Sequence, residues 1–276
     1  MKYNRSDNQA VEDIQIWHYG LCARDWAEFI TDEGEEASYF RKTIEDSGEP
    51  ALDLGCGSGR LLIPFLQAGL DVDGCDYSAD MLNVCRERLE AEGLTSQLYN
   101  QALHALDLPR RYRTIFASGV IGLGGSKHLT RQGMQRCYEH LRPGGTFTFD
   151  YQSPWNDPPY WKGWLPENRR SLPLDWFEPT AERQRLSNGD ELENTVRIVS
   201  QDPLEGVAVR DIRFRLWRDG KLVQEEIHTM KIEFYTKSEL ELMLELAGFE
   251  EVQIFGDFNG EPAGMDHKNL VFVARK

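Results

Sequence analysis

ALDLGCGSGR, residues 51–60, is the stretch that decides the fold of this chain of 276 residues. The apolar run that ends at Leu54 predicts a buried strand, and the apolar stretch from Arg60 to Leu66 predicts a helix. The glycines of the turn between them allow positive φ and let a ligand approach the backbone without meeting a Cβ atom. The stretch therefore predicts a βα unit whose turn supports a nucleoside.

A second short strand follows this helix and ends at Asp76, 21 residues after Gly55. At that separation a carboxylate at the end of the second strand of a βαβ unit accepts hydrogen bonds from two ribose hydroxyls. Asp76 is therefore the candidate that binds the ribose.

The glycine spacing separates two cofactors that use this geometry. A dinucleotide site has the pattern G-x-G-x-x-G, with a third glycine that places the pyrophosphate at the helix N-terminus. Here that third position is Arg60, and the acid Asp53 precedes the glycines, which suits a ligand that carries an ammonium and a sulfonium. The pattern favours S-adenosylmethionine over a nicotinamide dinucleotide.

With these residues in place, the chain resembles the class I S-adenosylmethionine-dependent methyltransferases. The resemblance lies in residues 52–59, in Asp76 within residues 74–82, and in the turn 141–145 before a strand at 146–149. It covers roughly residues 48–150, and residues 235–276 resemble the closing helix and strand pair. It implies a Rossmann-like, mostly parallel sheet of seven strands, with S-adenosylmethionine as cofactor and S-adenosylhomocysteine as product. The candidate cofactor-binding residues are Tyr19, Asp53, Gly55, Cys56, Gly57, Asp76, Tyr77, Met81, Leu103, Ser118 and Gly119.

The chain departs from the family pattern at two positions. Ala102 stands where the family usually has an acid that reads the adenine amino group, which leaves only the Leu103 backbone to contact adenine. Thr114 stands where the fourth strand usually begins with Asp. Both changes concern adenine contacts and affinity, and neither removes the fold.

Four segments follow from the pattern: an N-terminal helical cap over the cofactor (1–47), the cofactor-binding core (48–150), an antiparallel β insertion that acts as a substrate lid (151–230), and a closing helix and strand pair (231–276). Asn188-Gly189 and Asp219-Gly220 predict two-residue hairpin turns in the insertion. A hairpin centred on Asp219-Gly220 predicts that Ile212 faces Ile227 and Arg213 faces Glu226.

The entry to this insertion holds four of the seven tryptophans: Trp155, Trp161, Trp164 and Trp176. A loop with this many apolar residues is expected to pack against other parts of the protein. Two arrangements are equally open: the loop covers a reaction chamber, or its aromatic residues anchor it to the insertion itself. Within it, Asp157-Pro158-Pro159-Tyr160 spells a tetrapeptide of nucleobase amino methyltransferases, but it follows the fifth strand instead of the fourth. Methylation of a nucleobase stays a minor alternative.

Composition limits the partners. The net charge of −15 argues against nucleic-acid binding, which needs a basic stripe. Five cysteines without a C-x-x-C pair predict neither a disulfide framework nor a zinc site, and no metal site is expected. No long apolar stretch or signal core is seen, so a soluble, cytoplasmic monomer or homodimer without membrane contact is expected.

Methyl transfer is an in-line displacement that mainly needs alignment, a dry chamber and an acceptor lone pair. Tyr19, His104 and Tyr151 are the candidate catalytic groups near strand ends, and His104 is the candidate base. The expected activity is transfer of a methyl group to an amine or hydroxyl of a small molecule. Two other classes stay open: an NAD(P)-dependent oxidoreductase, and a non-catalytic protein that binds S-adenosylmethionine.

Overall fold

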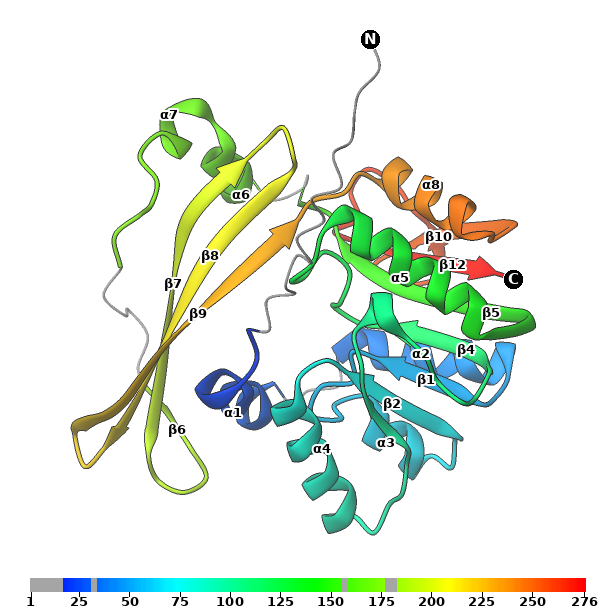
Figure 1. The fold of residues 1–276 in the computed structure, drawn as a ribbon, viewed down its shortest axis with the longest axis horizontal. Coiled ribbons are helices and arrows are strands. Elements are labelled where there is room, and N and C mark those ends of the chain that lie inside the picture. Colours follow the sequence, from blue (N-terminus) through cyan, green and yellow to red (C-terminus); the bar gives the residue numbers. More distant parts are fainter. Residues whose placement is uncertain (1–16, 31–33, 155–157, 177–182) are drawn as a thin grey trace.

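The computed structural model describes residues 17–30, 34–154, 158–176 and 183–276 (Figure 1). Its larger part is a sheet in the strand order β11-β10-β12-β5-β4-β1-β2-β3. The five strands from β5 to β3 run parallel, and β12 pairs with β5 in the antiparallel sense. The strands are β1 Ala51–Leu54, β2 Val72–Asp76, β3 Leu98–Asn100, β4 Tyr112–Ala117, β5 Leu141–Gln152, β10 Glu251–Gly256, β11 Glu261–Pro262 and β12 Asn269–Arg275. The predicted α/β class is confirmed, with a two-residue eighth strand, β11, added at one edge.

Helices cover both faces of this sheet because each presents one apolar side to it (Figure 1). On one face α5 (Lys127–His140) and α8 (Lys237–Ala247) pack against the aromatic residues of β5 and β12. On the other face lie α2 (Gly34–Ser47), α3 (Leu62–Gln67) and α4 (Ala79–Ala91). The carboxyl ends of the parallel strands stay free of these two layers, and ligands of such folds bind at that edge.

Two helix ends follow directly from capping chemistry. The Ser78 side chain accepts a hydrogen bond from the Met81 N–H at the start of α4. Thr236 and Glu239 form a reciprocal capping box at the start of α8, and Gly248 ends that helix at φ 108°. Both predicted helix starts are confirmed.

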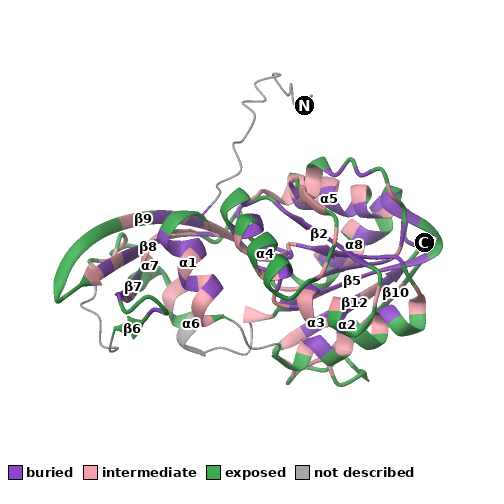
Figure 2. Cartoon of the chain, turned by 90° about the horizontal axis from the view of Figure 1, so that it is seen from below, coloured by how far each residue is buried: buried purple, intermediate pink, exposed green. Residues whose placement is uncertain are grey.

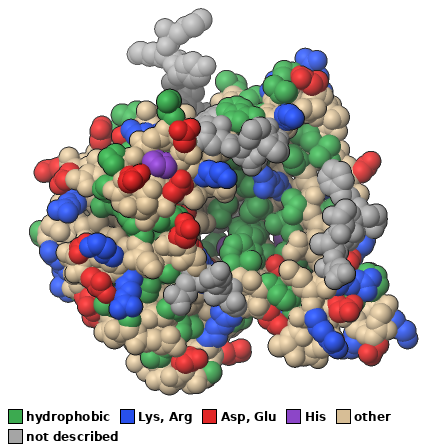
Figure 3. Space-filling model, turned by 180° about the vertical axis from the view of Figure 1, so that it is seen from behind, with side chains coloured by type: hydrophobic (Ala, Val, Ile, Leu, Met, Phe, Trp, Pro, Cys, Tyr) green, Lys and Arg blue, Asp and Glu red, His purple; other side chains and the backbone are tan. Residues whose placement is uncertain are grey.

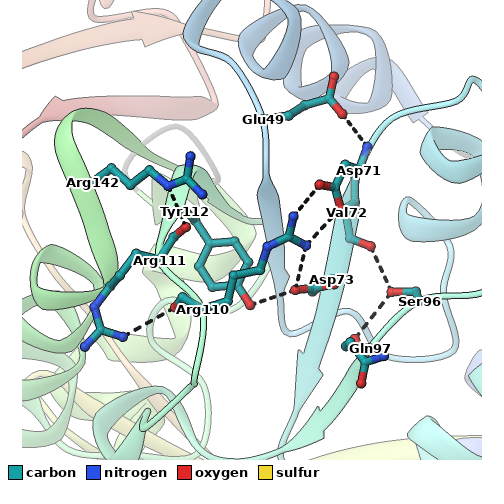
Figure 4. Close-up of polar contacts among 10 residues, drawn as sticks. All are labelled: Glu49, Asp71, Val72, Asp73, Ser96, Gln97, Arg110, Arg111, Tyr112 and Arg142. Atoms are coloured by element: carbon teal, nitrogen blue, oxygen red, sulfur yellow. Dashed lines mark hydrogen bonds and ion pairs between the residues drawn. The ribbon is translucent and has the colours of Figure 1, made fainter.

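The opposite edge of the sheet, at the amino ends of β2 and β4, is closed by polar contacts (Figure 4). Arg110 forms ion pairs with Asp71 and Asp73, and the Tyr112 hydroxyl donates to the Asp73 carboxylate over 2.9 Å. The basic run that contains Arg110 therefore ties the loop before β4 to β2, far from the ligand-binding edge.

The insertion after β5 forms a second, antiparallel sheet in the order β6-β7-β8-β9, as predicted. Two short helices, α6 Pro158–Trp164 and α7 Pro166–Arg169, lie between β5 and this sheet. The short 3-10 helix η1 Leu103–Ala105 belongs to the core and lies between β3 and β4. The strands of the second sheet, called here the inserted sheet, are β6 Gln184–Arg185, β7 Glu191–Asp202, β8 Val207–Arg218 and β9 Lys221–Glu233.

The predicted pairing of β8 with β9 is wrong by one residue. The turn at Asp219-Gly220 is where it was expected, and Trp217 pairs with Leu222. A register shift follows between Trp217 and Leu216, so Ile212 faces His228 and Arg213 faces Ile227. The β-bulge holds one extra residue on β9, which moves every later pair by one position.

The segment 1–47 is divided between the two sheets. Helix α1 (Gly20–Phe29) lies beside the inserted sheet, where Trp17, Leu21 and Cys22 join a cluster with Phe214 of β8 (Figure 2). Helix α2 instead packs on the main sheet. The division of the chain into four segments stays a prediction, as does the role of the first segment over a cofactor.

No helix in the described ranges is both long and apolar enough to span a lipid bilayer.

Candidate active site

The turn after β1 brings backbone close to the loop after β4. Gly55 has φ +81°, and a Cβ atom on it would lie 2.3 Å from the Val120 Cγ2. Only glycine fits both the left-handed backbone and this contact. The Val120 side chain therefore packs directly on the backbone of the turn.

Asp76 lies at the end of β2 and faces this turn. Its Oδ2 accepts a hydrogen bond from the Gly57 N–H over 2.9 Å, and its Oδ1 accepts from the Ser78 N–H over 2.7 Å. A carboxylate oxygen accepts more than one hydrogen bond, so each oxygen keeps capacity for a hydroxyl donor. The backbone therefore fixes the orientation of the acid that the sequence nominates for ribose.

A cavity of about 170 Å³, called here the strand-end cavity, lies between the turn, Asp76 and the loop after β4. Its walls include seven of the predicted cofactor residues: Gly55, Gly57, Asp76, Tyr77, Met81, Ser118 and Gly119. The other wall residues are Trp17, His18, Trp26, Ala102, Val120, Leu123 and Gly124.

Two predicted cofactor residues lie under the turn instead of on the cavity wall. Asp53 is 3% exposed, and its burial raises its pKa to about 8 against the attraction of Arg60. Cys56 is also buried; a hydrogen bond with Cys85, together with burial, raises its pKa. Both side chains therefore support the turn from below.

Leu103, His104 and Tyr19 are not among the wall residues of the strand-end cavity. Ala102 is on the wall, while the Leu103 side chain points to α5, 2.3 Å from where a Cβ on Gly133 would be. Burial lowers the pKa of His104, which favours the neutral ring that a base requires. Tyr19 is 45% exposed and its ring centroid is 4.2 Å from that of His228.

A larger cavity of about 520 Å³, the central cavity, lies between the main sheet and the inserted sheet. Figure 3 shows hydrophobic side chains gathered in a hollow near the middle of one face of the molecule. The central cavity shares four wall residues with the strand-end cavity: Trp17, Trp26, Gly119 and Leu123. The two cavities are therefore neighbours with a common wall.

The central cavity carries charged groups from both sheets. Asp150 of β5 lines it, and burial raises the pKa of this acid to about 6. Glu233 and Arg210 line it from the inserted sheet. Tyr151, the candidate catalytic residue of β5, also lines it, and its hydroxyl accepts from the Tyr235 N–H over 2.8 Å.

A third cavity, of about 260 Å³, is lined by Trp161, Trp164 and other apolar residues of the insertion. It shares Pro154 and Phe234 with the central cavity. Trp176 lies elsewhere, under the guanidinium groups of Arg197 and Arg213. Trp155 and Asp157, which the sequence also singled out, fall outside the described residues.

Sequence reasoning missed several wall residues. His18, Asp150, Arg210 and Glu233 were not nominated, and Trp17 and Trp26 were assigned only to helical patterning. The glycine-rich loop at residues 118–125 carried a usable signal, because its backbone lines both cavities. The sequence gives no such signal for Arg210 and Glu233, because they become wall residues only when the inserted sheet lies over the strand ends.

Residues 51–145 match the family model described as a methyltransferase domain. That match contains both the glycine turn and Asp76. Residues 51–145 are thus a methyltransferase domain, and the chain has the fold of the S-adenosylmethionine-dependent methyltransferases. The cofactor of these enzymes is S-adenosylmethionine.

Relatives resemble this methyltransferase over most of its length. A protein of Geobacillus sp. (strain WCH70) named as a methyltransferase is 25% identical over 250 residues, which are 87% of this chain and 91% of that protein. The S-adenosylmethionine-dependent methyltransferase from Clostridium acetobutylicum ATCC 824 has the same fold, with a TM-score of 0.69 at 16% identity, over 92% of this chain and 96% of the other. The sugar N-methyltransferase KedS8 from Streptoalloteichus sp. ATCC 53650 has a TM-score of 0.65 at 17% identity, over 93% and 92%.

The strand-end cavity fits the cofactor of this family better than a dinucleotide. The turn has Arg60 where a dinucleotide site has its third glycine, and the described wall residues include Asp76 and no lysine or arginine that would repel a cation. A cationic ligand with a ribose diol suits that wall, because the carboxylate accepts from hydroxyl groups and attracts positive charge.

Proposed function

We propose that this methyltransferase binds S-adenosylmethionine in the strand-end cavity and transfers its methyl group to an amine or hydroxyl of a small molecule in the central cavity. One observation carries the proposal: the two cavities share a wall, and the acid that suits ribose lines the smaller cavity and not the larger one. A methyl group that leaves the strand-end cavity past Gly119 and Leu123 would enter the central cavity.

The bound cofactor supplies an activated methyl group on a sulfonium. The chain itself supplies position: Asp76 holds the ribose, the backbone of Gly55 and Gly57 supports the nucleoside, and Met81 and Ala102 provide apolar wall for adenine. The inserted sheet supplies one wall of the central cavity through Arg210, Met230 and Ile232. Such a site needs no metal and no covalent intermediate.

The candidate catalytic residues fit the proposal unequally. Tyr151 lines the central cavity, so its ring and hydroxyl could orient an acceptor there. His104 and Tyr19 do not line the strand-end cavity, so they could act on the acceptor only through groups that line it. Among the three, we keep Tyr151 as the wall group closest to an acceptor.

The neighbours favour a small acceptor. KedS8 is a sugar N-methyltransferase, and 92% of its chain aligns with this fold. The central cavity, at about 520 Å³, has the size of a pocket for a small molecule rather than for a polymer.

Calorimetry with S-adenosylmethionine tests the cofactor assignment. Asp76→Asn removes the charge and leaves one carbonyl oxygen for the two backbone donors, and we expect it to weaken binding about a hundredfold. Asp76→Ala would leave the N–H groups of Gly57 and Ser78 without their acceptor, so a drop in stability is expected as well. Glu90→Ala, on the exposed surface of α4, is the matched control. Unchanged binding in Asp76→Asn would show that Asp76 does not bind the cofactor.

Release of S-adenosylhomocysteine separates an enzyme from a protein that only binds. We expect release to rise above the background without acceptor when amines and alcohols are supplied to the wild-type protein. Binding without such release over the whole set of acceptors would favour the non-catalytic alternative. A nicotinamide dinucleotide is expected not to compete for the site.

A further inference from the structure

Asp150 stands where the two cavities meet. It lies near the carboxyl end of β5 and lines the central cavity. Its Oδ1 accepts a hydrogen bond from the Gly119 N–H over 2.9 Å, and Gly119 lines both cavities. The carboxylate is therefore held beside the wall that a transferred methyl group would pass.

The second acid of the central cavity is differently placed. Glu233 accepts from the Tyr235 hydroxyl over 2.5 Å, and its Oε1 is 3.9 Å from the Lys231 Nζ. Its charge is thus compensated by groups of its own sheet. Asp150 instead receives a neutral backbone donor, with Arg60 and Glu36 acting on it in opposite directions from the sheet side.

Asp150 is half-buried, and a half-buried carboxylate with a neutral donor is stabilised most by a cation. Removing its charge from water is costly, and an ammonium group restores more of that free energy than a hydroxyl does. The shared residues Pro154 and Phe234 add apolar wall for the body of such a ligand. The arrangement suits an amine on an apolar or ring-shaped body.

We infer that the methyl acceptor is an amine that enters the central cavity as a cation, and that Asp150 binds its nitrogen. This inference rests on the proposed function and narrows its acceptor from amine or hydroxyl to amine. The ammonium gives one proton to the Asp150 carboxylate, which passes it to water. The nitrogen lone pair then forms the new nitrogen–carbon bond as the sulfur–carbon bond breaks, and that bonding pair stays on sulfur. The raised pKa of Asp150 makes it a stronger base than an exposed aspartate.

Three probes of one shape test the charge preference: cyclohexylamine, cyclohexanol and cyclohexanecarboxylate. The wild-type protein is first saturated with S-adenosylhomocysteine, and binding of each probe is then followed by protein-observed NMR at neutral pH. We expect the amine to bind about tenfold more tightly than the alcohol, and the carboxylate to bind most weakly.

Asp150→Asn removes the charge and keeps an oxygen for the Gly119 N–H. We expect this variant to bind the amine and the alcohol within about twofold of each other. Glu245→Gln, at an exposed position of α8, removes one charge elsewhere and is expected to keep the preference. Equal binding of amine and alcohol by the wild type, no binding of the amine, or an unchanged preference in Asp150→Asn overturns the inference.

The pH dependence of the wild type gives a test that needs no variant. Amine binding should fall as the pH drops through about 6, where Asp150 takes up a proton. The charged groups that face it are Arg60 and Glu36 from the sheet side, and Arg210 and Glu233 from the inserted sheet. A flat profile between pH 5 and 8 counts against Asp150.

The two levels of failure are distinguishable. If S-adenosylhomocysteine does not bind in the first step, the proposed function itself fails. If it binds but the probes show no preference for the amine, only the inference about the acceptor fails.

Discussion

The strand-end cavity and the central cavity are built in different ways. The first contains glycines of one turn, a glycine-rich loop and a single acid fixed by two N–H groups, beside side chains such as Trp17, Trp26 and Met81. The second also takes residues from β5, β8 and β9. In the proposed assignment, most of the cofactor wall comes from residues 55–124, while the acceptor wall is distributed over more distant segments.

The largest effect is expected from a methyl group added to the glycine turn of the strand-end cavity. In Gly55→Ala the new Cβ meets Val120 at 2.3 Å and the residue must keep φ +81°. The loop after β4 has to move, so we expect affinity for S-adenosylmethionine to fall about a hundredfold in calorimetry.

Gly69→Ala provides the matched control for that variant. Gly69 has φ +83°, but no atom lies within 4 Å of the added Cβ. It carries the same conformational cost of about 1 kcal/mol without the collision, so stability should drop while cofactor affinity stays. Equal affinity losses in the two variants would show that backbone strain, and not contact with the loop, decides the effect.

A smaller effect is expected from the shared wall. Trp17 lines both cavities, and its ring stacks on His18 at a centroid distance of 4.1 Å. We expect Trp17→Leu to weaken both S-adenosylmethionine and the cyclohexylamine probe about tenfold. Trp164→Leu, which changes only the third cavity, should leave cofactor affinity as it is. A Trp17 variant that affects only one ligand would separate the two cavities.

Which features could be predicted from the sequence follows the same division between the two cavities. The Ser78 cap and the Thr236 capping box were predictable because each acts through its near neighbours in the chain. Gly55 and Asp76 were predictable because the glycine pattern and the separation of 21 residues mark them. The pairing of β8 with β9 was predicted one residue off, because nothing in the alternation of apolar residues marks a bulge. Asp150 was not nominated because its role depends on a sheet formed by residues 184–233.

Asp53 offers a test of the support under the turn. Its pKa is raised from 3.8 to about 8, so the folded chain keeps a proton that the unfolded chain releases between these values. The stability contribution of this group therefore falls as the pH rises from about 4 to about 8. Asp53→Asn cannot ionise, and we expect its melting temperature to exceed that of the wild type by several degrees at pH 8.5 and to match it near pH 4.

The exposed Asp46 is the control for Asp53. It pairs with Lys42 on the surface of α2, so Asp46→Asn should shift the melting temperature little at either pH. A constant difference between Asp53→Asn and the wild type over the whole pH range would contradict the raised pKa.

The smallest effect is expected in the inserted sheet. The observed register places Arg215 opposite Glu225, with 2.6 Å between the Arg215 Nε and the Glu225 Oε2. A double-mutant cycle with Arg215→Met and Glu225→Gln should give a coupling of about 0.2–1 kcal/mol in chemical unfolding, because the pair is partly exposed. The pair predicted from the unshifted register, Arg213 and Glu226, should show weaker coupling. A stronger coupling between Arg213 and Glu226 than between Arg215 and Glu225 would instead support the pairing without a bulge.

The wall common to both cavities has a thermodynamic consequence. An occupant that presses on Trp17, Trp26 or Leu123 from one side changes the surface that the other occupant meets. Linkage then requires that donor and acceptor alter each other's affinity by the same factor.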